Sequence, residues 1–138
     1  MEIVTHEIAE DIMTLSVTAN KFPEGVKGAY KKLASHVPDF QSRHMYGVAE
    51  QLNDGLLYRA CVLQNSADEP GKFDVDSYTI PKGTYLFSIL KDWQEHMDLF
   101  GKYFEQLLAH PDTKKDSIGV ESYLSSTEVM LMVQKKKG

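Results

Sequence analysis

Residues 118–133 read IGVESYLSSTEVMLMV, and residues 46–61 read YGVAEQLNDGLLYRAC. The two stretches share Gly-Val at an offset of 72 residues, and each places a polar turn between two runs of β-forming residues. Asn53-Asp54-Gly55 favours a tight turn because these residue types tolerate positive φ. Residues 125–128 are the matching turn of the second stretch. The sequence therefore predicts two β-hairpins.

Each hairpin follows a strand and a helix. Residues 11–18 alternate between apolar and polar side chains, and apolar residues then recur at helical spacing between Pro23 and Pro38. In the second half, residues 78–90 are rich in β-formers, and Asp92 with Glu95 resembles a capping box ahead of a helix that Pro111 closes. Both halves therefore read strand, helix, strand, strand.

We predict an α+β fold built from duplicated strand–helix–strand–strand units, in a single domain covering residues 1–138. The units are residues 1–64 and 77–138, and the acidic Pro-Gly segment 65–76 links them. They should form a curved antiparallel sheet with two helices on one face and a ligand cleft on the other.

Composition excludes several classes of protein. The single cysteine, Cys61, rules out a disulfide framework, and a net charge of −5 disfavours direct binding of nucleic acid. The only basic run, at residues 135–137, is typical of a solubilising tail. Early acidic residues and the lack of a long apolar run predict a cytoplasmic protein without a membrane segment.

The hairpin register decides which side chains share a face. Pairing Leu124 with Val129 sets Glu121 opposite Met132, on the sheet face turned away from the helices. The same register sets Glu50 opposite Arg59 as a cross-strand charge pair. The residues expected on the helix-free face are Ala49, Gln51, Tyr58, Ala60, Glu121, Tyr123, Met130 and Met132.

A face with tyrosines, methionines and one carboxylate is unusual for a solvated sheet. It is interpreted as a cleft for amphipathic ligands, in which Glu121 anchors a positive centre and the rings and thioethers provide adaptable contacts. The alternatives are an ordinary amphipathic sheet, or a surface that a homodimer mate or another protein partner covers.

The stretch from Ile80 to Tyr85, followed by a helix and by Ile118-Gly119-Val120-Glu121-Ser122-Tyr123, resembles the gyrase-inhibitor-like effector-binding domain. That domain forms the C-terminal half of many multidrug-sensing bacterial transcription activators and also occurs alone. The resemblance implies that Glu121 lies at the floor of a cleft for cationic aromatic compounds. It also implies that Tyr58 and Tyr123 line the walls.

Trp93 is a candidate for the cleft rim, although it could equally begin the apolar stripe of the second helix. Met130, Met132 and Gln51 complete the predicted ligand site. Only the second half carries the Glu-x-Tyr pair, because Ala49 and Gln51 occupy the matching positions. The chain also begins directly at the effector-like domain, so we expect it to act without a DNA-binding module of its own.

Signatures of an enzyme are sparse. The five histidines lack the spacing of metal ligands, no phosphate-binding glycine loop occurs, and Cys61 is expected to be a buried thiol. No cofactor or metal is therefore predicted. The leading hypothesis is a stand-alone protein that senses or sequesters cationic aromatic small molecules. The alternatives are a hydrolase of reactive electrophiles that uses Glu121 as general base, and a gyrase-inhibitor-like module that binds a protein partner.

Overall fold

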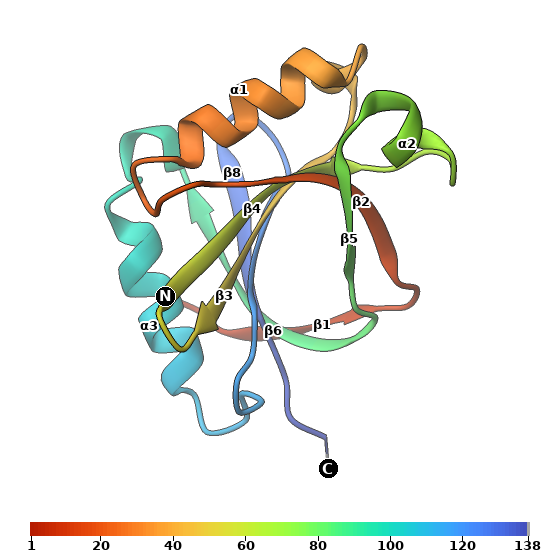
Figure 1. Cartoon of the computed structure of the whole chain (residues 1–138). Coiled ribbons are helices and arrows are strands. Elements are labelled where there is room, and N and C mark those ends of the chain that lie inside the picture. Colours follow the sequence, from red (N-terminus) through yellow and green to blue (C-terminus); the bar gives the residue numbers. More distant parts are fainter. Residues whose placement is uncertain (138) are drawn as a thin grey trace.

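The computed structural model describes residues 1–137, which form one curled antiparallel sheet of eight strands with helices on its outer face (Figure 1). The strands are β1 (Val4–Ile8), β2 (Ile12–Thr18), β3 (Met45–Leu52), β4 (Gly55–Leu63), β5 (Asp76–Ile80), β6 (Gly83–Lys91), β7 (Gly119–Tyr123) and β8 (Glu128–Gln134). The helices are α1 (Val26–His36), α2 (Glu69–Phe73) and α3 (Leu99–Ala109). Among the described residues, no helix is long and apolar enough to cross a membrane.

The strand order is symmetric about the centre of the sheet. It runs β1-β6-β8-β7-β3-β4-β2-β5, so each half of the chain supplies three adjacent strands, β3-β4-β2 and β6-β8-β7. The first strand of each half, β1 or β5, pairs at the outer edge of the other half. The halves meet where β3 pairs with β7. The predicted α+β fold with a curved antiparallel sheet is confirmed, and the duplication into units 1–64 and 77–138 stays a prediction.

Short connections force the sheet to curl. β1 and β2 lie near opposite edges, yet only residues 9–11 separate them, and only Pro81 and Lys82 separate β5 from β6. A flat sheet would hold β1 and β2 about 29 Å apart at ~4.8 Å per strand, and the connecting residues reach about 14 Å at most. The two crossings touch, since the Lys82 backbone N–H donates to Asp11 Oδ1 at 2.9 Å.

Curling encloses one apolar core inside the sheet and leaves a second layer under the helices. The inner core contains Ile8, Val48, Ile80, Tyr85, Val120 and Met132. On the outer face, α1 packs through Leu33 onto β2 and β4, and α3 packs through Leu107 onto β6 and β8. The two helices cover separate parts of the outer face, which leaves the central pair β3 and β7 between them (Figure 1).

The segment 65–76 contains α2, which an ion pair ties to the body of the domain. Arg43 donates two hydrogen bonds to the Glu69 carboxylate, at 2.9 and 2.7 Å, and a third to Asp39 at 2.8 Å. The Asn65 backbone N–H also donates to Glu69, at 2.7 Å. Sequence reasoning predicted neither this pair nor β1.

The predicted capping box is wrong. Asp92 has a left-handed backbone with φ 56° and no side-chain cap, and Trp93 lies in a 3-10 turn (Trp93–Glu95) ahead of α3. The cause is the neighbouring hairpin, because the backbone N–H of Asp92 donates to the carbonyl of Thr127 at 2.6 Å. Residues 92–98 are therefore a connection along the sheet, and the helix begins only at Leu99.

The predicted register of the second hairpin is wrong by one residue. Tyr123, and not Leu124, pairs with Val129, so Glu121 lies opposite Leu131. The backbone N–H groups of Leu124 and Ser125 both donate to the Glu128 carbonyl, which adds one residue to the turn. Glu121 and Tyr123 consequently share the outer, helix-covered face with Val129 and Leu131, opposite to the predicted side.

In the first hairpin the observed pairing differs from the predicted pairing by two residues. An even shift does not change which side chains of the two strands lie on the same face of the sheet. Ala49 pairs with Tyr58, and Val48 takes the place opposite Arg59 that was predicted for Glu50. Arg59 still reaches Glu50 diagonally, at 3.0 Å. Tyr58 therefore lies on the same outer face as Glu121, as the shared-face prediction required.

Candidate functional site

Glu121 lies on β7, on the outer face, near the centre of the sheet, and is 9% exposed. Tyr58 donates a hydrogen bond to Glu121 Oε1 at 2.6 Å, and Tyr123 donates to the same oxygen at 2.8 Å. Oε2 receives no hydrogen bond from residues 1–137 and is not fully enclosed. One carboxylate oxygen is thus held in place, and the other is free to meet a ligand.

Helix α1 contributes a third phenol to this cluster. Tyr30 Oη lies 2.9 Å from Tyr58 Oη and donates to the Tyr46 carbonyl at 2.8 Å. The Tyr30 hydroxyl thereby ties α1 to β3, and the Tyr58 hydroxyl ties β4 to Glu121 on β7. This network fixes the Tyr58 ring, whose side chain is only 2% exposed.

Glycines on the two central strands make room for the site. Gly47 pairs with Glu121, and a Cβ added there would overlap Tyr58 Oη and Glu121 Oε1 and lie 2.9 Å from Tyr30 Oη. At Gly119 an added Cβ would lie 3.0 Å from the ring of Phe104 on α3. The carboxylate and its phenols therefore occupy space that any side chain at position 47 would fill.

Two further aromatic rings border the cluster. The Trp93 ring lies 5.0 Å from that of Tyr123 in an edge-to-face arrangement, and Phe22 stacks on Tyr58 at 5.7 Å. Phe22 is 44% exposed, so it forms an outer wall. We call Phe22, Tyr30, Tyr58, Trp93 and Tyr123, grouped around Glu121, the aromatic box.

The electrostatics of the aromatic box favour a cationic guest. Burial raises the pKa of Glu121, and the hydrogen bonds from Tyr58 and Tyr123 oppose that rise. Burial and the Glu121 charge raise the pKa values of Tyr30, Tyr58 and Tyr123, so the phenols stay protonated as donors. A cation next to Oε2 would replace part of the solvation that the carboxylate loses on burial.

The structure brings together four of the predicted site residues, namely Glu121, Tyr58, Tyr123 and Trp93. Met132 is buried in the inner core, and Met130 packs against that core. Both methionines lie on the helix-free face as predicted, but the register shift places Glu121 and Tyr123 on the opposite face. Gln51 is exposed at the hairpin end, where its amide donates to the carbonyls of Leu52 and Gly55.

Sequence reasoning missed Tyr30 and Phe22. Tyr30 was counted among the apolar positions of the first helix, although its hydroxyl is the one polar group in that stripe. Cys61 was expected under the helices and instead lies in the inner core, where burial raises the pKa of its thiol to about 12. Within residues 1–137, no group of three His, Cys, Asp or Glu side chains could hold a metal ion.

The sequence matches no protein-family model and no curated protein. Solved structures do share the fold. An integron cassette protein from the mobile metagenome of Vibrio cholerae, VCH_CASS2, has a TM-score of 0.68 at 16% identity, and the match covers 97% of this chain and 95% of that one. SAV2435 bound to tetraphenylphosphonium has a TM-score of 0.66 at 17% identity, with 100% and 95% covered.

A hydrolase from Listeria innocua has a TM-score of 0.65 at 9% identity, with 98% of this chain and 92% of that chain covered. At such low identity these likenesses show a common fold. The function of this chain has to be argued from its own residues.

Proposed function

We propose that this protein binds small amphipathic cations that carry aromatic groups, with Glu121 as the anionic anchor of the aromatic box. The observation that carries the proposal is the buried Glu121 carboxylate, whose Oε2 accepts no hydrogen bond within residues 1–137. Tyr58 and Tyr123 donate to its other oxygen, and the rings of Phe22 and Trp93 contact those two tyrosines. SAV2435, which shares the fold, is bound to a cation of this class.

The energetics suit such a ligand. An aromatic ring facing a cation contributes roughly 0.5–2 kcal/mol, and more where water is excluded. A carboxylate held at 9% exposure is poorly solvated, so pairing it with a cation recovers energy that a neutral ligand could not. The ligand class is therefore set by charge at the centre and by aromatic area around it.

Trp93 provides a direct assay, because it is the single tryptophan of the chain and contacts Tyr123. Tetraphenylphosphonium should quench or shift its fluorescence saturably, and neutral triphenylphosphine oxide of similar shape should bind at least ~10-fold more weakly, about 1.4 kcal/mol. Glu121→Gln should lose that preference for the cation. Glu105→Gln, an exposed position on α3, is the matched control and should behave like the wild type.

Equal affinity of wild type and Glu121→Gln for the cation would overturn the anchoring role. Equal binding of the neutral compound would show that the aromatic box recognises shape alone. Both measurements use the folded full chain, and circular dichroism of each variant checks that the fold is kept.

Hydrolysis of a reactive electrophile is the second candidate function. It is favoured by the raised pKa of Glu121, which suits a general base toward water, and by the Tyr58 and Tyr123 hydroxyls beside it. A protein named a hydrolase shares the fold. Turnover of activated esters and epoxides that Glu121→Gln abolishes would support this candidate, and stoichiometric binding without turnover would remove it.

A further inference from the structure

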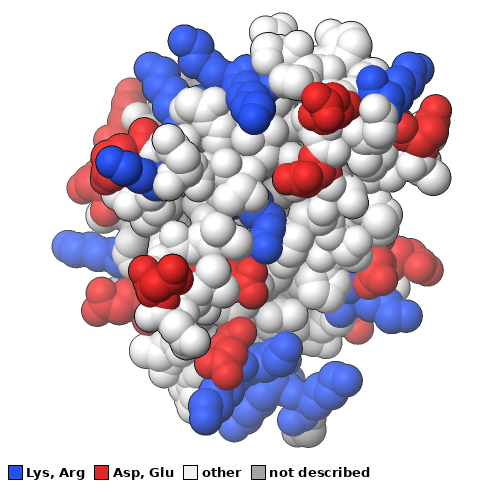
Figure 2. Space-filling model, in the orientation of Figure 1, with Lys and Arg blue, Asp and Glu red and all other residues white. Residues whose placement is uncertain are grey.

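A hollow that shares no lining residue with the aromatic box lies where the start of β6 meets the end of β8. Its volume is about 830 Å³. Among the residues that line it, every charged one is a lysine, namely Lys82, Lys114, Lys135, Lys136 and Lys137. Figure 2 shows lysine and arginine side chains gathered at this lower end of the molecule, near the C-terminus marked in Figure 1.

These lysines carry unpaired charge. In the part of the chain that the structure describes, the three ion pairs all use arginine, so no carboxylate lies within 4.0 Å of a lysine of this hollow. The nearby acid Glu7 accepts a hydrogen bond from Thr84. Five unneutralised positive charges around one hollow stand out in a chain whose net charge is −5.

Backbone hydrogen bonds hold the walls of the hollow in place. The N–H of Lys135 donates to the Thr84 carbonyl at 2.9 Å, and the N–H of Lys136 donates to the Asp112 carbonyl at 2.8 Å. The N–H of Lys114 donates to the Gln134 carbonyl at 2.8 Å. Residues 135 and 136, predicted to belong to a solubilising tail, are therefore anchored to two other segments.

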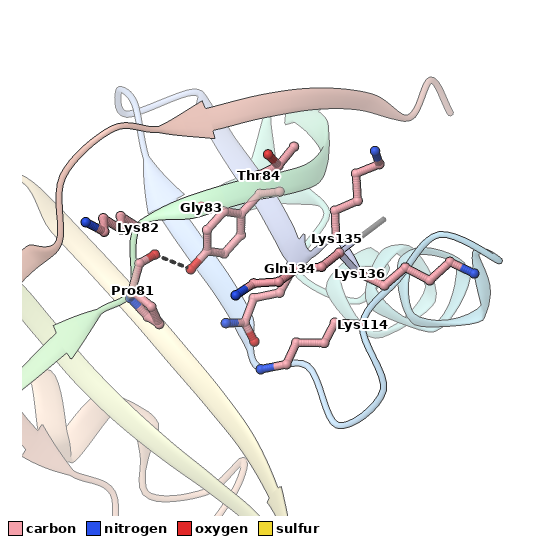
Figure 3. A pocket seen from close by; sticks show the side chains of 10 residues that line it. Pro81, Lys82, Gly83, Thr84, Lys114, Gln134, Lys135 and Lys136 are labelled. Atoms are coloured by element: carbon pink, nitrogen blue, oxygen red, sulfur yellow. Dashed lines mark hydrogen bonds between the residues drawn. The ribbon is translucent and has the colours of Figure 1, made fainter.

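Within residues 1–137 the lysine ammonium groups of the hollow and the Gln134 amide nitrogen have no acceptor, whereas the Thr84 and Tyr85 hydroxyls donate to Glu7 and to the Pro81 carbonyl. Figure 3 shows the Lys114 side chain and the Gln134 amide on the same side of the hollow, with Lys82 on the other side and Lys135 and Lys136 at its rim. Gln134 uses its Oε1 to accept from the Ile118 N–H, at 3.2 Å, which leaves its amide nitrogen for a ligand. Lysine ammonium groups bind phosphates as flexible point charges.

We propose that this hollow, which we call the lysine pocket, binds a small anion with several phosphoryl groups, such as a linear or nucleoside triphosphate. A cavity of about 830 Å³ is of the size that holds a small ligand. Five positive charges match a multiply charged guest better than a monoanion. The site shares no lining residue with the aromatic box, so the proposal does not rest on the proposed function.

Isothermal titration of the full chain with sodium tripolyphosphate and with ATP tests the proposal. We expect saturable one-to-one binding that weakens as salt is raised, because lysine–phosphate attraction is screened. The double variant Lys114→Ala/Lys135→Ala should bind at least ~10-fold more weakly, since charge-assisted contacts are the stronger hydrogen bonds. Lys27→Ala/Lys31→Ala removes the same charge from exposed positions of α1 and should stay close to wild type.

Equal binding of tripolyphosphate and ATP would identify the phosphate chain as the recognised group, and tighter binding of ATP would add a contribution from its nucleoside. Glu121→Gln should leave both affinities unchanged. The proposal is overturned if neither anion binds at millimolar concentration, if the two double variants lose affinity equally, or if only DNA binds, with an affinity that grows with its length.

Discussion

Replacing Gly47 by alanine should displace the Glu121 carboxylate and the tyrosine hydroxyls that lie over β3. The added Cβ would overlap Tyr58 Oη and Glu121 Oε1 and lie 2.9 Å from Tyr30 Oη. Overpacking of this kind costs about 1–3 kcal/mol, and weakening a charge-assisted hydrogen bond adds about 1–2 kcal/mol. We therefore expect the free energy of unfolding to fall by about 2–5 kcal/mol.

Urea unfolding followed by Trp93 fluorescence measures this change. With a slope of about 2 kcal/mol per molar urea, the midpoint should move down by about 1–2.5 M. Tetraphenylphosphonium affinity should fall as well, because the carboxylate can no longer rest above β3. Gly28→Ala is the matched control: nothing lies within 4 Å of its added Cβ on α1, and alanine there should raise stability by about 0.5–1 kcal/mol.

The reasoning would be refuted by a Gly47→Ala protein that unfolds within about 0.5 kcal/mol of the wild type and binds the cation equally well. That result would mean that the carboxylate and the phenols move aside without cost. The packing of Tyr58 and Glu121 over Gly47 would then be incidental to the site.

Three further predictions concern charge and access. The pKa of Glu121 in the folded state is raised above 4.5, so its contribution to the free energy of unfolding is complete below pH 4.5 and is lost as the pH rises through the folded-state pKa. Cation affinity should rise over the same interval, because the carboxylate becomes charged. Urea unfolding and fluorescence titration from pH 4 to 8 measure the two trends. Arg43→Met should cost about 3–5 kcal/mol in a urea melt, because it leaves the buried Glu69 carboxylate without its cation. Arg59→Met, at a partly exposed pair, should cost under about 1 kcal/mol. The pKa of Glu69 is lowered from 4.5 to about 2 by its hydrogen bonds to Arg43. Its contribution to the free energy of unfolding should therefore be lost as the pH falls from 4.5 to 2 in the wild type, and Arg43→Met should show no such loss. Phe22→Ala should lower cation affinity about 3- to 10-fold in the fluorescence titration, with little change in the urea midpoint, since the ring is 44% exposed.

The fold could be predicted because its signals are local. Alternation over residues 11–18 matches β2, and Asn53-Asp54 forms a tight turn between β3 and β4. β1 escaped prediction because four of its five residues are exposed, so no apolar face marks it in the sequence. α2 escaped because a long-range ion pair to Arg43 holds its first residue, Glu69.

The sequence analysis predicted that Glu121, Tyr58 and Tyr123 share a face, but it placed them on the wrong side of the sheet. Glu121, Tyr58 and Tyr123 do converge, because their shared face depends on parity within each hairpin. Tyr58 lies on the helix-covered face although its hairpin keeps the predicted parity, so the face that the helices cover is not encoded in the hairpin patterns. In the second hairpin, one additional turn residue at Leu124 moves Glu121 and Tyr123 to that face. The same residue removes Met130 and Met132 from the site.

The position of Glu121 on the face that carries the helices, between α1 and α3, affects how a ligand would enter. Because Glu121 is 9% exposed and Tyr58 2% exposed, we expect a large guest to reach Oε2 by displacing an outer ring of the aromatic box, Phe22 or Trp93. Both rings belong to connections that lead from a strand to a helix, β2 to α1 and β6 to α3, which occupy matching places in the symmetric strand order. The strands that carry the anchor are hydrogen-bonded on both sides, whereas these connections are not part of the sheet. The range of ligand sizes should therefore be set by how far the two connections open, and the preference for positive charge by the fixed carboxylate beneath them.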